Sequence, residues 1–87
     1  MSSYTVVWDK DARDELARLW IDNPRLRQEI TAAADGIEPL FAVRPLEVGV
    51  VTSAHTRQYV EPPLKFLYTV SESDCLVRVL YVKFWED

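Results

Sequence analysis

Two stretches near the end of the chain decide its fold: Leu64-Lys65-Phe66-Leu67-Tyr68-Thr69-Val70 and Cys75-Leu76-Val77-Arg78-Val79-Leu80-Tyr81-Val82-Lys83-Phe84. Both are rich in β-branched and aromatic residues, and the polar run Ser71-Glu72-Ser73-Asp74 separates them, which predicts an antiparallel hairpin. Pairing Val70 with Cys75 would gather an almost wholly apolar set of side chains on one face. That set is Phe66, Tyr68, Val70, Cys75, Val77 and Val79. We expect this face to pack against helices.

The opposite face of the hairpin mixes bases with large apolar residues, namely Lys65, Leu67, Thr69, Leu76, Arg78, Leu80, Val82 and Phe84. Nothing in the pattern supplies a second helical layer to cover it, so it is predicted to be a binding surface. The members expected to contact a partner are Leu67, Leu80, Val82 and Phe84. Alternatively, the C-terminal residues or a second copy of the chain in a homodimer cover this face.

The residues before the hairpin predict one strand and two helices. Residues 4–8 are aromatic and β-branched, and Asp9 can cap the helix that follows with its carboxylate. Apolar residues then recur at helical spacing up to Asn23-Pro24, where one helix ends and another begins. Gly36 and Pro39 predict a kink or short break in the second helix near residues 36–38.

Further strands are expected between these helices and the hairpin. Arg44-Pro45 ends the helical region, Gly49 marks a turn, and residues 50–51 and 56–60 read as short strands. The chain is therefore expected to be one α+β domain over residues 1–87, in which an antiparallel sheet of about three strands packs on a helical hairpin. Its core is expected to include Cys75 and four aromatic residues, Trp8, Trp20, Tyr68 and Tyr81.

Composition narrows the class of function. Ten basic and fourteen acidic residues give a formal charge of −4, unlike the usual basic balance of a general nucleic-acid binder. Cys75 is the only cysteine, so no disulfide framework or thiolate zinc cluster is expected, and no metal or cofactor motif appears. No apolar run reaches the length of a membrane span, and the N-terminus lacks a signal pattern. A cytoplasmic protein is the expectation.

The order of these pieces resembles the RelE/ParE superfamily of type II toxin–antitoxin toxins, also known as plasmid stabilisation proteins. The segments that carry the resemblance are Tyr4-Thr5-Val6-Val7-Trp8 with Asp11-Ala12-Arg13-Asp14-Glu15-Leu16, then Arg44-Pro45-Leu46-Glu47-Val48-Gly49, Arg57-Gln58-Tyr59, Pro63 to Val70 and Val77 to Val82. The resemblance implies a toxin that is silenced by a cognate antitoxin. It also implies one of two targets: messenger RNA cleaved on the ribosome, or DNA gyrase.

The ribonuclease branch suggests a catalytic set for this chain. By resemblance, Lys65 takes the position of an arginine that contacts the scissile phosphate, three residues before Tyr68. Arg57 lies near basic positions of the preceding strand, whereas the family's C-terminal basic residue has no match. Cleavage through the 2′-hydroxyl needs a base and cations around the phosphate. His55 or Glu61 as base, with Arg57, Lys65 and Arg78 as cations, is one hypothesis.

The same residues could instead have simpler, structural roles. His55 and Glu61 could be solvated residues, and Arg78 could form a structural ion pair with Glu61 or Glu72. Whether the chain is an endoribonuclease therefore stays open. The other possibilities are a toxin that binds a protein target without catalysis, and a degenerate relative that acts as a binding or regulatory module without toxicity.

Overall fold

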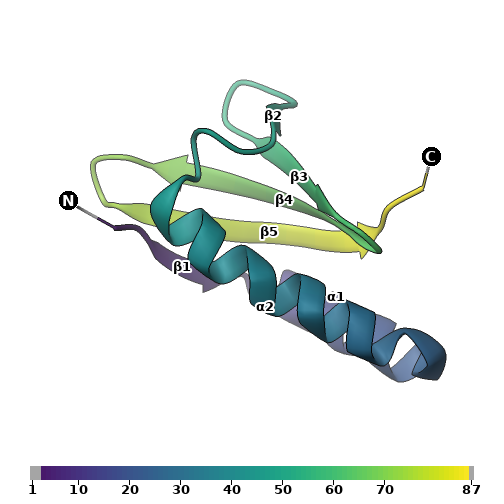
Figure 1. The fold of residues 1–87 in the computed structure, drawn as a ribbon. Helices are drawn as coiled ribbons and strands as arrows, with labels where there is room; N and C mark the ends of the chain where they lie inside the picture. The colour runs from purple at the N-terminus through teal and green to yellow at the C-terminus, as the bar shows by residue number, and fades with distance from the viewer. Residues whose placement is uncertain (1–2, 87) are drawn as a thin grey trace.

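A computed structural model describes residues 3–86 of the chain. These residues form an α+β fold with one five-stranded mixed sheet of order β1-β5-β4-β3-β2 (Figure 1). The elements are β1 (Thr5–Trp8), α1 (Lys10–Asp22), the 3-10 turn η1 (Pro24–Leu26), α2 (Arg27–Val43), β2 (Val50–Val51), β3 (Arg57–Glu61), β4 (Leu64–Ser71) and β5 (Leu76–Phe84). The expected α+β class and the element order are confirmed. The sheet is wider than expected because β1 joins it, parallel to β5.

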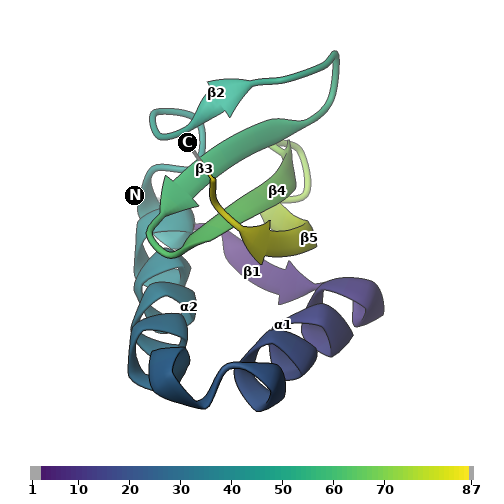
Figure 2. The same cartoon turned by 90° about the vertical axis from the view of Figure 1, so that its right-hand side faces the viewer.

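The two helices meet the sheet in different ways. Helix α2 lies across one face of the sheet, whereas α1 continues from β1 and runs beside β5, so that the helices diverge from their connection (Figure 2). The core fills the space between the helices and the sheet, and α1 contributes Ala12 and Leu19 to it. Its fully buried side chains include Ile30, Ile37 and Phe41 from α2, Leu64, Phe66 and Tyr68 from β4, and Val77, Val79 and Val82 from β5. No helix in residues 3–86 combines the length and apolar character needed to cross a bilayer.

The β4–β5 hairpin has a different register from the expected one. Val70 pairs with Val77 rather than Cys75, because residues 72–75 all belong to the turn. Cys75 lies in that turn with a φ of 51°, outside the core where it was expected. The shift is an even number of residues, so Tyr68 and Val77 still face the helices.

A β-bulge then alters the second half of β5. Tyr68 pairs with Val79, but its neighbour Leu67 pairs with Tyr81, so Leu80 is the extra residue. Beyond the bulge the alternation of side chains is reversed. Val82 is fully buried and Phe84 packs against the core, whereas Tyr81 is 41% exposed. The prediction that Val82 and Phe84 lie on the open face is therefore wrong, as is the placement of Tyr81 in the core.

Three local expectations for the helices also change. Helix α2 runs unbroken through Pro39, because buried Ile37 and Phe41 hold it on the sheet on both sides of that residue. Asp9 occupies the N-cap position of α1 but makes no capping hydrogen bond. Trp20 is 40% exposed, donates to Thr31 and stacks on Arg27, so it covers the connection between the helices instead of entering the core. Trp8 does contact the core, edge-on to Phe66.

Candidate functional site

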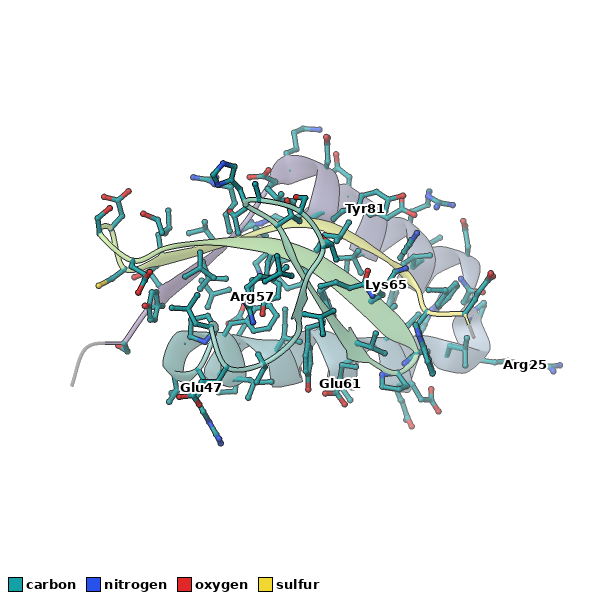
Figure 3. The ribbon with its side chains drawn as sticks, turned by 90° about the horizontal axis from the view of Figure 1, so that it is seen from above. Arg25, Glu47, Arg57, Glu61, Lys65 and Tyr81 are labelled. Atoms are coloured by element: carbon teal, nitrogen blue, oxygen red, sulfur yellow. The ribbon has the colours of Figure 1, made fainter. Side chains whose placement is uncertain are left out.

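Arg57 and Lys65 lie on opposite faces of the sheet. Arg57 pairs with Tyr68, which is buried on the α2 side, whereas Lys65 and Leu67 alternate with the buried residues of β4. Figure 3 labels both bases. An open-face phosphate site that uses both side chains is therefore not formed.

Arg57 instead holds the segment that connects α2 to β2. Its Nη2 atom donates to the carbonyl oxygens of Leu46 and Val48, at 3.0 and 3.1 Å. The Tyr68 hydroxyl lies 2.9 Å from the carbonyl oxygens of both Pro45 and Val48. These bonds satisfy carbonyl groups of a loop that crosses the end of the core, so Arg57 has a structural role there.

Gly49 is required by the same arrangement. Its φ is +72°, which favours glycine. A Cβ atom at this position would lie 2.5 Å from the Gln58 carbonyl oxygen and 2.9 Å from the Tyr68 hydroxyl. Burial raises the pKa of Tyr68, and the nearby Arg57 guanidinium opposes that rise. The hydroxyl therefore keeps its proton and remains a donor to the loop.

Arg78 and His55 lie at two further places. The Nη1 atom of Arg78 donates to Oδ1 of Asp9 at 3.0 Å, so its ion pair is with the residue after β1 and not with Glu61 or Glu72. His55 is exposed on the loop between β2 and β3 and shares a groove with Arg57. Glu61 accepts a hydrogen bond from the Tyr59 hydroxyl on the α2 side. The hypothetical catalytic set is thus divided among several sites.

Lys65 has partners that the sequence did not suggest. It pairs directly with Lys83 across β4 and β5, and both line an open groove of about 490 Å³ between α1 and β5. We name this the α1–β5 groove; its lining residues are Glu15, Arg18, Leu19, Lys65, Tyr81, Lys83, Phe84 and Glu86. Partial desolvation and then the neighbouring Lys83 cation lower the pKa of Lys65. Within residues 3–86 neither lysine forms an ion pair, and the three bases of the lining outnumber its two carboxylates, Glu15 and Glu86, so the groove is a candidate surface for an anion.

The sequence pattern does not place Lys83 and Tyr81 on the open face, because their orientation depends on the bulge at Leu80. An unbroken alternation through Val79 would turn Tyr81 and Lys83 toward the core. The sequence did contain a signal for the bulge: a tyrosine and a lysine at inward positions of an otherwise apolar strand. A bulge can turn such side chains outward. Of the predicted partner-binding residues, Leu67 is opposite Tyr81 on the open face and Leu80 is half-buried at the bulge.

A second groove is more apolar and lies between the two helices. Its volume is about 560 Å³, and we name it the interhelical groove. It is lined by Trp8, Arg13, Leu16, Ala17, Trp20, Ile21, Ile30, Thr31, Ala34, Asp35 and Glu38. Ile21 is 61% exposed and Trp20 is 40% exposed, so the groove has two large apolar side chains at its edge. Within residues 3–86 no group of three or more histidine, cysteine or acidic side chains could hold a metal ion.

Solved structures with a similar fold come from bacterial toxin–antitoxin systems. No family model and no curated relative matches the chain. A chain of the toxin–antitoxin complex RelBE2 from Mycobacterium tuberculosis is 23% identical with a TM-score of 0.78; the match covers 100% of this chain and 97% of that one. A chain of the chromosomal ParDE system from P. aeruginosa is 14% identical with a TM-score of 0.76, over 95% and 97% of the two chains. The isolated E. coli RelE toxin is 17% identical with a TM-score of 0.63, over 97% and 86%.

These likenesses define the class of fold. The described chain has the RelE/ParE fold, and the resemblance drawn from its sequence is confirmed at that level. Two similar structures carry RelE-type names and one carries a ParE-type name, and each match covers at least 95% of this chain and at least 86% of the other. Because both branches share the fold, the fold alone does not distinguish their targets.

Proposed function

We propose that this chain is the toxin of a type II toxin–antitoxin pair, neutralised by a cognate antitoxin and inhibiting bacterial growth. The observation that carries the proposal is the full-length match to RelE- and ParE-type toxin systems together with a sheet face that no described element covers. An uncovered face that carries Lys65, Lys83 and Tyr81 is suited to a macromolecular target.

The antitoxin is proposed to occupy the interhelical groove. Trp20 and Ile21 present large apolar area at its edge, and Leu16, Ile30 and Ala34 supply apolar walls. A groove of this shape between two helices fits the apolar face of an amphipathic helix. Antitoxin binding there would leave the α1–β5 groove as the surface that acts on the target.

Inhibition of a protein target by binding is the mechanism that the geometry supports best. A ribonuclease needs several cations and a base around one phosphate, whereas Arg57, Arg78 and His55 each lie away from Lys65. Gyrase, as in the ParE branch, is one such protein target. The open face is proposed to contact it through Leu67, Tyr81 and the two lysines.

Cleavage of messenger RNA is the second candidate, and one observation favours it. Lys65 lies directly opposite Lys83, so two cations are close enough to contact one phosphate group. Tyr81 could then orient the nucleotide. A chain without toxicity, acting only as a binding or regulatory module, is the remaining alternative.

Controlled induction in a bacterial culture tests the proposal. The wild type is compared with Lys65→Ala/Lys83→Ala and with a control, Arg25→Ala/Arg44→Ala, which also removes two positive charges. Arg25 and Arg44 are exposed and lie outside the α1–β5 groove, and Figure 3 shows Arg25 at the far end of the molecule. We expect growth arrest with the wild type and the control, and growth with the lysine variant.

Secondary readouts separate the candidates. Arrest without cleavage of messenger RNA indicates a protein target, whereas mapped RNA ends that disappear in the lysine variant indicate a ribonuclease. If soluble wild-type protein accumulates and the culture grows normally, the toxin proposal is wrong. An equal arrest by the lysine variant would remove the α1–β5 groove from the mechanism.

A further inference from the structure

Strand β4 extends beyond its partner β3. The pairing of the two strands ends at Arg57 opposite Tyr68, but β4 continues for three more residues, Thr69, Val70 and Ser71. The chain leaves the sheet before Arg57, because the backbone N–H groups of Thr52 and Ser53 both donate to the Thr56 carbonyl oxygen and close the β2–β3 loop. One edge of β4 is therefore left open over three residues.

The pairing pattern identifies which backbone groups are free. Two residues connect β3 to β4, so Glu61 and Leu64 are a hydrogen-bonded pair next to the turn. Such pairs alternate along an antiparallel ladder, so Arg57 and Tyr68 also form one. The next hydrogen-bonded pair along the ladder would join Val70 to His55. His55 has left the sheet, so the N–H and C=O of Val70 point at this edge where the β3–β4 pairing of the described residues has already ended.

A groove of about 350 Å³ lies beside Val70, where a paired residue of β3 would otherwise be. We name it the β4-edge groove; it is lined by Leu46, Val51, Ser53, Ala54, His55, Thr56, Arg57, Thr69, Val70 and Ser71. The lining contains two basic side chains, four hydroxyl groups and no carboxylate. Arg57 forms no ion pair with a described residue, and its buried Nε atom has no hydrogen-bond partner there. The groove therefore combines the short open edge of β4 with the positive charge of Arg57 at one end.

We propose that the β4-edge groove binds an extended, acidic segment of a partner protein. One residue of that segment pairs with Val70 and takes the two free backbone groups, as an added strand does. Its side chain lies on the same face as Tyr68 and Arg57, since residues two apart along a strand share a face. A glutamate at that residue reaches the guanidinium group of Arg57, with His55 beside it.

A second copy of this chain does not fit the groove. The outermost strands, β1 and β2, contain no acidic residue; they read Thr5-Val6-Val7-Trp8 and Val50-Val51. The part of β3 that extends beyond β2 contains Glu61, but its carboxylate already accepts a hydrogen bond from the Tyr59 hydroxyl. Asp9, after β1, is already paired with Arg78. The open strand edges of a second copy thus offer no free carboxylate among residues 3–86, and the proposed segment belongs to another protein. The inference uses neither the interhelical groove nor Lys65 and Lys83, so it stands or fails separately from the proposed toxicity.

Nuclear magnetic resonance of the full-length chain, labelled with ¹⁵N, tests the proposal. The probe is the acetylated and amidated peptide Thr-Val-Glu-Val-Thr, compared with the same peptide carrying lysine in place of glutamate. A third peptide carries an N-methyl group on the glutamate, which removes one backbone donor. We expect the Val70 amide to shift and to exchange more slowly with the glutamate peptide, and both altered peptides to bind about tenfold more weakly.

A pair of charge-matched variants localises the effect. His55→Glu places a carboxylate at the groove, and Gln28→Glu makes the same change of net charge on the exposed surface of α2. The glutamate peptide should bind His55→Glu about tenfold more weakly than the wild type and Gln28→Glu as tightly as the wild type. Equal affinity for the glutamate and lysine peptides, no binding, or shifts at Thr5–Trp8 in place of Val70 would overturn the proposal.

Discussion

The two faces of the β4–β5 hairpin contrast sharply although their residues alternate along the same strands. On the α2 side, Leu64, Phe66 and Tyr68 are completely buried, as are their neighbours Val77, Val79 and Val82. On the other side, Lys65 is opposite Lys83 and Leu67 is opposite Tyr81; Tyr81 and Lys83 are exposed and Lys65 and Leu67 are half-buried, with α1 only at the margin of the groove that they line. The buried face supplies the apolar burial that stabilises the fold, and the open face is free to bind.

The bulge at Leu80 shows how the two faces are adjusted to each other. It turns Val82 inward, where it extends the core, and Tyr81 and Lys83 outward, where they join Lys65. One inserted residue therefore adds to both faces at once. Because the effect depends on where the insertion occurs, the composition of the strand alone does not determine which face each side chain occupies.

The largest expected effect comes from a matched pair of truncations on neighbouring residues of β4. Phe66→Ala leaves a cavity beside Trp8 and should lower the free energy of unfolding by about 3–5 kcal/mol. Leu67→Ala, one residue along on the half-buried open side, should lower it by only about 1 kcal/mol. Urea unfolding followed by tryptophan fluorescence measures both. Equal losses would mean that the open face is covered in solution, as it would be in a homodimer.

The parts of this fold that could be predicted from sequence are those fixed by local periodicity. The strand at residues 5–8, the two helices and the hairpin follow from the spacing of apolar residues and from Asn23-Pro24. The register of the hairpin could not be predicted, because the turn takes in Cys75 at a positive φ, a conformation that an ordinary residue adopts only rarely. The register differs from the expected one by an even number of residues, so the side chains expected to face the helices still do so up to Val79.

A smaller effect is expected from the pH dependence of Tyr68. The folded pKa lies above the unfolded value of about 10, so the folded protein holds this proton more tightly. Its contribution to stability is complete below pH of about 10 and is lost as pH rises through the folded pKa. Tyr68→Phe should lower the free energy of unfolding by about 1 kcal/mol at pH 8 and make stability fall less steeply above pH 10.

Urea unfolding between pH 8 and 11 measures this difference in slope. Tyr59→Phe is a useful control, because burial also raises the pKa of Tyr59, whose hydroxyl donates to Glu61 and not to the connecting loop. Both variants should therefore flatten the alkaline loss, but only Tyr68→Phe should loosen residues 45–48, seen as faster amide exchange there. An alkaline slope that Tyr68→Phe leaves unchanged would contradict the prediction.

The candidate site was harder to predict than the fold, because charged side chains do not reveal the side of a strand on which they lie. Arg57 was expected to work with Lys65, yet it faces α2 and binds carbonyl groups of Leu46 and Val48. An arginine can do this with partial burial because its donors satisfy several acceptors at once. Only the long-range pairing of β3 with β4, absent from any local pattern, places the two bases apart.

The smallest expected effect concerns the base on the open face that is already paired. Arg78 and Asp9 keep 47% and 36% of their side-chain area exposed, so their ion pair should contribute at most about 1 kcal/mol. A double-mutant cycle with Arg78→Ala and Asp9→Ala measures that coupling in urea, and 1 M salt should remove most of it, since the Debye length is then about 3 Å. A coupling of about 2 kcal/mol or more that persists in salt would show that the pair is buried in solution. The open face would then be covered near β1, and Lys65 and Lys83 would be its only accessible bases among residues 3–86.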